Sequence, residues 1–333
     1  MNSKQKTMLA LASIALAAPQ IVASQTTLLN ASYDVSREFY KDYNTAFVAH
    51  YKKTTGKDVK IDQAHGGSSA QARAVNDGLD ADVVTMNTTT DVEFLANAGV
   101  VAKDWTRKFP NNAAPTTSTM LFLTRNGNPK AIRDWNDLVK PDIKVIVVNP
   151  KTGGNGRMAY LAAWGYVRKT GGSDAQAAEF VAKLFKNVPV LAKGGRDATA
   201  TFLQRNIGDV LITFESEVVS VDKEFGAGKV DAIHPSSSIV AENPVAVVER
   251  TVAKKGTVEQ AKAYLNFLYS DEGQEIAAKH AIRPTNPAIL KKYASTFKPI
   301  ALFRAEDYFG SFAEAQKVHF NDGGQFDKLY TVK

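Results

Sequence analysis

Apolar residues in the first third of the chain recur with strand spacing and then with helix spacing. The predicted strands are TLLNASY (27–33), VKIDQAH (59–65) and ADVVTM (81–86). After the first strand, one helical face carries four aromatic residues, Phe39, Tyr43, Phe47 and Tyr51. Gly56 is expected to end that helix, and further helices are predicted at 70–79 and 92–98. This alternation is typical of an α/β fold.

The same alternation begins again in the middle of the chain. Its predicted strands are IKVIVVNP (143–150), VPVLAK (188–193) and DVLITF (209–214), each followed by a predicted helix. Extended runs at 117–129 and 244–250 separate this group from the rest, and 261–280 is strongly helical. We therefore predict two lobes, each a sheet flanked by helices, joined by two extended crossings. Lobe 1 would comprise residues 25–114 and 247–333, and lobe 2 residues 115–246.

The N-terminus has the layout of a cleavable secretory signal peptide over residues 1–24. Lys4 and Lys6 form a positive region, Met8–Ala18 is apolar, and small residues at 22–24 suit cleavage. No later segment of the sequence is apolar for long enough to span a bilayer. The chain has no cysteine, which excludes disulfides, thiolate chemistry and lipid attachment to a cysteine. We expect a soluble protein in the bacterial periplasm after cleavage.

The charge balance does not favour nucleic acid as a partner. The formal net charge of +7 falls to +5 when Lys4 and Lys6 leave with the signal peptide. Acidic and basic residues are interspersed, without the Lys/Arg tract of a nucleic-acid-binding arm. A weak attraction of small anions fits this balance better.

Four predicted strand-to-helix junctions are rich in glycine or hydroxyl residues. They are SYDVSRE (32–38), HGGSSAQA (65–72), KTGGNGRM (151–158) and KGGRDATA (193–200). The first N–H groups of a helix lack intrahelical partners and lie at the positive end of its dipole, so a helix start can bind an anion. Glycine lets the backbone approach the ligand, and Ser68, Ser69 and Thr152 add hydroxyl donors. One such junction is ordinarily a turn or a cap, but four, two in each lobe, favour one shared anion site.

Known catalytic and nucleotide motifs are absent from the sequence. The five histidines are scattered singly and predict no metal site. His65 near Ser68 leaves an enzymatic alternative, an exported hydrolase of sulfate or phosphate esters with Ser68 as nucleophile. No base with an orienting partner is evident, so we predict a binding protein without a cofactor rather than an enzyme.

Several long segments resemble those of the periplasmic sulfate/thiosulfate-binding proteins of ABC importers. Among them are LLNASYD, IDQAHGGSSAQA, ADVVTMN, NPKTGGNGR, IGDVLITFESE and AYLNFLYSDEGQEIAAK. The resemblance covers essentially the whole mature chain, and DVVTMN, FESEV and GNGR are more similar to the thiosulfate-binding branch. It implies a two-lobed periplasmic binding protein of type II, a monomer that closes over its ligand and docks on the membrane permease of the importer.

The resemblance also implies which residues bind the anion. The family holds sulfate through backbone N–H, hydroxyl and indole donors, without a cationic side chain in contact. Carried over to this chain, the binding residues are Asp34 (through its N–H), Ser68, Gly153, Gly154, Asn155, Gly195 and Phe214. Arg157 and Arg196 match positions behind these residues.

Two of these positions depart from the sulfate-binding branch, which has a serine where this chain has Gly153 and a tryptophan where it has Phe214. Phe214 cannot donate a hydrogen bond, so we expect its ring to pack against the sulfane sulfur of thiosulfate.

The ionisation of the ligand bears on which anion is bound. Sulfate carries no proton at neutral pH and needs only donors, whereas an acceptor carboxylate would favour hydrogen phosphate. Sulfate, thiosulfate and another tetrahedral oxyanion, such as molybdate or phosphate, all remain open at this point.

Overall fold

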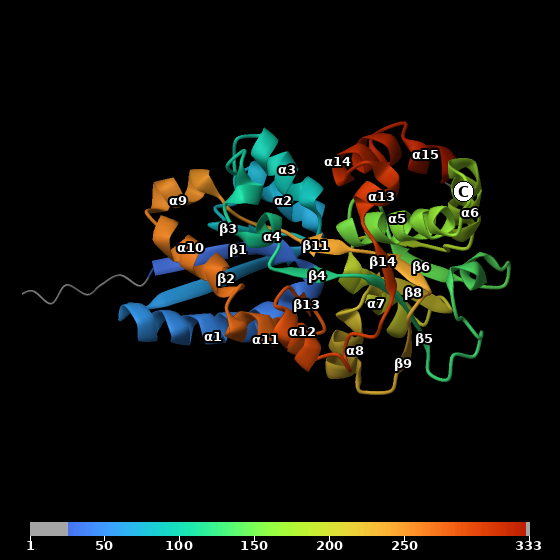
Figure 1. Ribbon diagram of the computed structural model, residues 1–333, viewed down its shortest axis with the longest axis horizontal. Coiled ribbons are helices and arrows are strands. Elements are labelled where there is room, and N and C mark those ends of the chain that lie inside the picture. Colours follow the sequence, from blue (N-terminus) through green and yellow to red (C-terminus); the bar gives the residue numbers. More distant parts are fainter. Residues whose placement is uncertain (1–25, 331–333) are drawn as a thin grey trace, which may run out of the picture.

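A computed structural model of the chain describes residues 26–330, so the predicted signal peptide at 1–24 lies outside the described residues. Figure 1 shows two groups of helices and strands side by side, with strands running between them. Each group has its own sheet and its own hydrophobic core, as predicted. We call them lobe 1 and lobe 2 below.

Lobe 1 is built on a four-stranded sheet of order β12-β3-β1-β2. Its strands are β1 (Thr26–Tyr33), β2 (Val59–Gly66), β3 (Val83–Thr85) and β12 (Val245–Val247). Strands β1, β2 and β3 are parallel, and β12 runs antiparallel to β3. The helices are α1 (Arg37–Thr55), α2 (Ser68–Asn76), α3 (Thr89–Asn97), α9 (Glu249–Lys255), α10 (Val258–Phe267) and α11 (Asp271–Lys279). Short turns η1 (Asp34–Ser36), η2 (Trp105–Arg107) and α4 (Pro110–Ala113) complete it.

Lobe 2 is built on a five-stranded mixed sheet of order β7-β6-β8-β5-β9. Its strands are β5 (Met120–Arg125), β6 (Val145–Val148), β7 (Leu191–Ala192), β8 (Val210–Phe214) and β9 (Val230–Ile233). Strand β6 is parallel to β7 and β8, while β5 is antiparallel to β8 and β9. The helices of this lobe are η3 (Trp135–Val139), α5 (Gly154–Lys169), α6 (Asp174–Lys186), α7 (Gly195–Leu203) and α8 (Glu217–Phe225).

Two small sheets lie outside the two main ones. Strands β4 (Thr116–Ser118), β11 (Ala241–Asn243) and β13 (Arg283–Pro284) form an antiparallel sheet in the order β11-β4-β13. Figure 1 shows β4 and β11 in the middle of the molecule, where the chain crosses between the lobes. Strand β10 (Ser237–Ile239) pairs with β14 (Ala301–Phe303).

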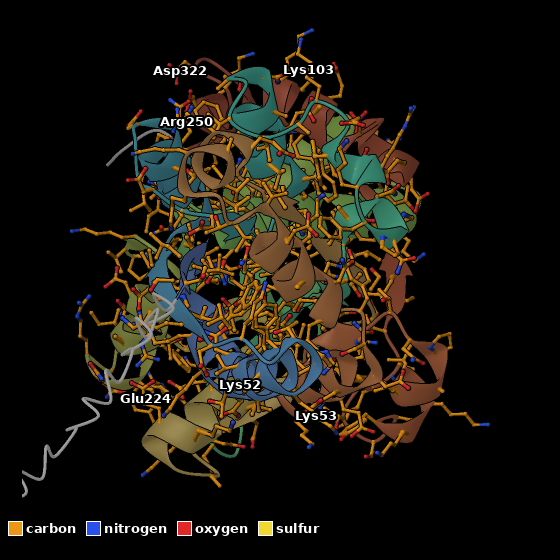
Figure 2. All side chains as sticks on the ribbon, turned by 90° about the vertical axis from the view of Figure 1, so that its left-hand side faces the viewer. Lys52, Lys53, Lys103, Glu224, Arg250 and Asp322 are labelled. Carbon is orange, nitrogen blue, oxygen red and sulfur yellow. The ribbon has the colours of Figure 1, made fainter. Side chains whose placement is uncertain are left out.

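Helix α1 shows why the sequence folds as predicted in lobe 1. Phe39, Tyr43 and Phe47 are buried in the first core. The rings of Tyr43 and Phe47 pack against Tyr264 and Phe267 of α10. Gly56 ends the helix with a φ of 72°, a left-handed conformation that suits glycine. Figure 2 shows Lys52 and Lys53 beside α1 on the outside of the molecule, where their charges favour the C-terminal end of the helix dipole.

The predicted helical stretch 261–280 is two helices, α10 and α11. The break occurs because Ser270 caps α11, its Oγ accepting the N–H of Gly273 (3.1 Å). A side-chain oxygen thereby replaces a main-chain acceptor at the new helix start.

The C-terminal segment packs differently from the sequence expectation. It contains α12 (Pro287–Lys292), α13 (Ala305–Phe309), α14 (Phe312–Ala315), the π-helix η4 (Gln316–Phe320) and α15 (Gln325–Leu329). Phe303, Phe309, Phe320 and Phe326 are buried in the second core, and Figure 1 shows α13–α15 beside α5 and α6. The expected lobe 1 range of 247–333 therefore does not hold from about residue 301, because aromatic side chains there pack with lobe 2.

Candidate functional site

The start of α5 leaves three main-chain N–H groups without a helical partner. The N–H of Gly153 donates to the carbonyl oxygen of Asn149 (3.0 Å), which closes the turn before the helix. The helix begins at Gly154, and the N–H of Arg157 donates to the Gly153 oxygen (3.2 Å). The N–H groups of residues 154–156 precede this bond and point out of the helix end, where they are suited to an anion.

Helices α2 and α7 start in the same way. In α2, the N–H of Gln71 donates to the oxygen of Gly67 (2.9 Å), and in α7 the N–H of Ala198 donates to the oxygen of Gly194 (3.0 Å). Each helix therefore also presents first-turn N–H groups that its own backbone does not satisfy.

These three helix starts lie close together across the lobe interface. A Cβ placed on Gly67, before α2, would lie 3.5 Å from the Thr152 carbonyl oxygen and 3.8 Å from that of Lys193. Those two residues precede α5 and α7. A Cβ placed on Gly195 would lie 3.7 Å from Nδ2 of Asn155. The starts of α2, α5 and α7 thus converge on one region.

Gly154 contacts lobe 1 directly. A Cβ on Gly154 would overlap Oδ1 of Asn87 and would lie 2.7 Å from the methyl carbon of Thr88. Real Cβ atoms do not approach that closely, so a side chain at 154 would push these segments apart. Glycine is required here by a close approach between the lobes.

Ser68 and Asn155 are buried polar residues on opposite sides of the interface, 1% and 4% exposed. Oγ of Ser68 accepts the N–H of Asn87 (3.3 Å) and lies 3.5 Å from the sulfur of Met86. Nδ2 of Asn155 donates to the Thr213 hydroxyl (3.2 Å), whereas its Oδ1 has no partner among the described residues. The structure therefore brings the predicted Ser68, Gly154, Asn155 and Gly195 into one neighbourhood.

Phe214 ends strand β8, directly after Thr213, whose hydroxyl holds Asn155. The phenylalanine is 2% exposed and packs within the second core. Its ring supplies an apolar group at the end of that strand.

Asp34 connects the lobes through its carboxylate as well as through its position after β1. Its Oδ1 accepts the N–H of Val35 (3.0 Å), and its Oδ2 accepts the N–H of Arg196 in the first turn of α7 (3.1 Å). Burial raises the pKa of Asp34 above its ordinary value, and these N–H groups act in the opposite direction. The sequence argument considered only the N–H of Asp34 and missed this contact.

Arg157 forms a charged bridge between the lobes. From α5 its guanidinium donates to Oδ1 of Asp91 on α3 (3.0 Å) and to the hydroxyl of Ser69 on α2. It also donates to Thr90 (3.3 Å) and to Gln316 of η4 (2.7 Å). The arginine is 8% exposed, so its charge is turned toward protein groups and away from water.

Arg157 accounts for the ionisation of Asp91. Burial alone would raise the pKa of Asp91, but the Arg157 charge and hydroxyl donors lower it below its ordinary value. We call Arg157, Asp91 and Ser69 the charged bridge. No sequence motif marks Asp91, because it lies 66 residues from its partner.

Arg196, the other predicted arginine, is different. Its side chain pairs with Glu224 on the surface (2.5 Å) and is about half exposed. Only its main-chain N–H reaches the interface, through Asp34.

Gly153 lies against strand β6. A Cβ at this position would lie 2.6 Å from Cγ1 of Val148. A serine there would require the valine side chain, which is stiff because it is branched at Cβ, to move.

The enzymatic alternative finds no support in the contacts of Ser68. His65 binds the hydroxyl of Ser32 through Nδ1 (2.8 Å), and its other ring nitrogen contacts Gln63. Burial lowers the pKa of His65 to about 4. Neither hydrogen bond of Ser68 goes to a histidine, so the pair lacks the contact that activates a nucleophile.

Glu217, which the sequence reasoning did not single out, is a buried carboxyl near α7. Its Oε2 accepts the hydroxyl of Thr199 (2.6 Å). Burial above all raises the pKa of Glu217 to about 7, and the nearby charge of Asp34 raises it further.

Comparison with known proteins identifies the family. The family model described as bacterial extracellular solute-binding protein matches residues 35–283. The chain belongs to this family.

Several relatives within the family are similar over nearly their whole length. The thiosulfate-binding protein of Pseudomonas aeruginosa is 55% identical over 305 residues, covering 91% of this chain and 92% of that protein. The sulfate-binding protein of Escherichia coli is 50% identical, covering 94% and 96%. The thiosulfate-binding protein of Escherichia coli is 47% identical, covering 98% and 97%. The resemblance found in the sequence is therefore confirmed.

Solved structures agree with this family assignment. The sulfate-binding protein SubI from Mycobacterium tuberculosis has a TM-score of 0.82 at 31% identity, covering 89% of this chain and 100% of that one. A periplasmic thiamin binding protein, at 18% identity, has a TM-score of 0.65 and shares the fold alone. The predicted two-lobed α/β fold is confirmed.

Within residues 26–330, no group of three or more His, Asp or Glu side chains is arranged to hold a metal ion. Within the same range, no helix combines the length and the apolar character that a membrane crossing requires.

Proposed function

We propose that the protein captures a fully ionised tetrahedral anion, sulfate or thiosulfate, in the periplasm and delivers it to the membrane permease of an ABC importer. The observation that carries this proposal is the convergence of the starts of α2, α5 and α7 across the lobe interface. First-turn N–H groups from both lobes would reach one anion only when the lobes are closed. Binding would therefore favour the closed form, which the permease would recognise.

The proposed binding residues are the N–H groups of Asp34, Gly154, Asn155 and Gly195 with the hydroxyl of Ser68. Gly153 and Phe214 would shape the neighbouring surface. Hydrogen bonds to a charged group contribute about 1.5–3 kcal/mol each, so these five would supply about 8–15 kcal/mol, enough for the ~8 kcal/mol of micromolar binding before ordering is subtracted. No arginine needs to touch the ligand.

Both carboxylate oxygens of Asp34 are hydrogen-bonded to main-chain groups beside the proposed site. Each of its carboxylate oxygens already accepts a main-chain N–H, from Val35 or Arg196. A ligand that keeps a proton would need an acceptor, and each of these oxygens already accepts one main-chain N–H. Sulfate and thiosulfate need donors alone.

Sequence identity does not separate sulfate from thiosulfate. The identities to two thiosulfate-binding proteins, 55% and 47%, lie on either side of the 50% to a sulfate-binding protein. The choice depends on the site, where Gly153 and Phe214 lack the hydroxyl and indole donors expected for sulfate. We therefore propose thiosulfate as the better ligand of the two.

Calorimetric titration with sulfate, thiosulfate, phosphate and molybdate tests the proposal. We expect micromolar or tighter binding of thiosulfate and sulfate and much weaker binding of phosphate. Gly154→Ala should weaken anion binding tenfold or more, because its Cβ would overlap Asn87 and block closure. Gly67→Ala is the matched control, since its Cβ would make only an ordinary contact at 3.5 Å.

Equal affinity for phosphate and sulfate would contradict the donor-only site. Turnover of aryl sulfate or phosphate esters that Ser68→Ala abolishes would favour the hydrolase instead. Binding by Gly154→Ala as tight as that of the unaltered protein would contradict the placement of the anion at the lobe interface.

A further inference from the structure

We propose that Asn87 binds the captured anion through its side-chain amide and acts as a specificity residue of the site. The inference rests on the proposed function and adds to it a residue from lobe 1. Neither the glycine-rich junctions nor the resemblance assigns a ligand contact to this position.

Asn87 lies between two of the proposed binding residues. It comes two residues after β3 ends, at the carboxyl end of a parallel strand, where ligands of α/β sheets bind. Its N–H donates to Oγ of Ser68 (3.3 Å). Its Oδ1 is close enough to Gly154 to overlap any side chain there. Asn87 therefore spans the gap between the start of α2 and the start of α5.

The side chain of Asn87 is buried, and its amide oxygen has no hydrogen-bond partner among the described residues. The residue is 4% exposed. Buried polar atoms are nearly always paired, because an unpaired one costs about 1–3 kcal/mol. An unpaired amide oxygen between two helix starts marks an amide that protein groups leave available to a ligand. A dianion needs donors, so it would be bound by the NH2 group of this amide after the side chain turns.

Asn30 of the same lobe shows the contrast. It is fully buried, and both ends of its amide are bonded: Nδ2 donates to the hydroxyl of Tyr264 (3.2 Å) and Oδ1 accepts the hydroxyl of Thr85 (3.0 Å). A structural asparagine in this lobe is thus satisfied by protein groups, and Asn87 is not.

The chemistry of an amide suits a site made of neutral donors. A half-turn about the Cβ–Cγ bond exchanges Oδ1 and the NH2 group, which places two donors beside Gly154. The amide adds no charge, so it would hold a dianion without needing a counter-ion. A carboxylate at the same place would repel a dianion and accept the proton of hydrogen phosphate.

The test compares the intact mature protein with Asn87→Ala, the near-isosteric Asn87→Asp, and the control Asn97→Ala, which lies exposed on α3. Each is titrated calorimetrically with sulfate, thiosulfate, phosphate and molybdate, and its unfolding temperature is measured without anion. The variants are compared for the anion that the unaltered protein binds most tightly. If that anion is neither sulfate nor thiosulfate, the proposed function is contradicted, but the comparison of the Asn87 variants still tests whether Asn87 contacts the ligand.

We expect Asn87→Ala to bind that anion about tenfold more weakly, with an unfolding temperature close to that of the unaltered protein. Asn87→Asp should bind a dianion at least a hundredfold more weakly and should shift the ratio of affinities toward phosphate. Asn97→Ala should match the unaltered protein.

Affinity of Asn87→Ala within twofold of the unaltered protein would overturn the inference. The same holds if Asn87→Asp binds dianions no more weakly than Asn87→Ala, because a carboxylate facing the ligand must repel it. If Asn87→Ala has a lowered unfolding temperature, its affinity is not used. The affinity of Asn87→Asp, which keeps the size of the side chain, then tests the inference.

Discussion

Two regions of the lobe interface use charge in opposite ways. At the charged bridge, the Arg157 guanidinium meets Asp91, and the pKa of the aspartate is lowered. Near the start of α7, Asp34 is half-buried and Glu217 is buried, each beside N–H or hydroxyl donors, and both pKa values are raised. One region pairs opposite charges, and the other surrounds its carboxyls with neutral dipoles.

The difference bears on how a basic protein could present the proposed anion site without a charged side chain in contact with the ligand. Arg157 follows the α5 start within three residues, yet it turns to a protein carboxylate instead of the ligand region. Its charge pairs with Asp91 of the other lobe, and the N–H groups of residues 154–156 remain available for the proposed anion. Within the GGNGR segment, the arginine side chain thus contacts the other lobe, and the main-chain N–H groups are the ones proposed to bind the anion.

The largest expected effect comes from breaking the charged bridge. Arg157→Met should lower the free energy of unfolding by about 3–5 kcal/mol, because it leaves the buried Asp91 carboxylate without its counter-charge. Urea unfolding measures this change. Arg196→Met is the control, since its surface pair with Glu224 is about half exposed and should contribute about 0–1 kcal/mol. If both variants lose the same free energy of unfolding, the charged bridge contributes no more to stability than the surface pair does.

The second effect tests the region without a counter-charge. The pKa of Glu217 is about 7 in the folded protein and 4.5 in its unperturbed state. Between these pH values the folded state holds a proton that the unfolded state releases, so the contribution of Glu217 to stability falls as pH rises across this window.

Glu217→Gln should remove this dependence and raise the free energy of unfolding at pH 8 by roughly 3 kcal/mol. At pH 4.5 the variant and the unaltered protein should be similar. Urea unfolding at both pH values checks the sign, with Glu224→Gln as the exposed control. The same pH dependence in Glu217→Gln and the unaltered protein would show that this carboxyl is not the titrating group.

The smallest effect concerns Gly153. Gly153→Ser should lower the free energy of unfolding by about 1 kcal/mol, because its Cβ presses on Val148. Adding Val148→Ala relieves the overlap, so the double variant isolates the new hydroxyl. We expect this double variant to bind sulfate more tightly relative to thiosulfate than Val148→Ala does. An unchanged ratio would mean that position 153 does not reach the ligand.

The local parts of the fold were predictable because they depend on neighbours in sequence. The aromatic face of α1 and its end at Gly56 follow from helical spacing and from the conformational freedom of glycine. Most strands of both sheets follow from short apolar runs, whereas β9 (Val230–Ile233) was not predicted. The break between α10 and α11 was missed, although Ser270 marks it, because the apolar pattern continues on both sides.

The packing of the C-terminal segment was not predictable from its order in the chain. Phe320 and Phe326 pack against Tyr160 of α5, with ring centroids 5.0 and 6.1 Å apart. Nothing local to 301–330 says which core its aromatic residues join, since both cores accept apolar side chains.

The sequence by itself determined the class of fold, the family and the helix starts rich in N–H donors, because glycine, hydroxyl and apolar patterns act over a few residues. Only the tertiary structure decided that Arg157 meets Asp91, that Asp34 caps α7 and that Asn87 faces Gly154. These contacts join residues tens of positions apart. Their geometry follows from how two separately packed lobes meet, which no local pattern encodes.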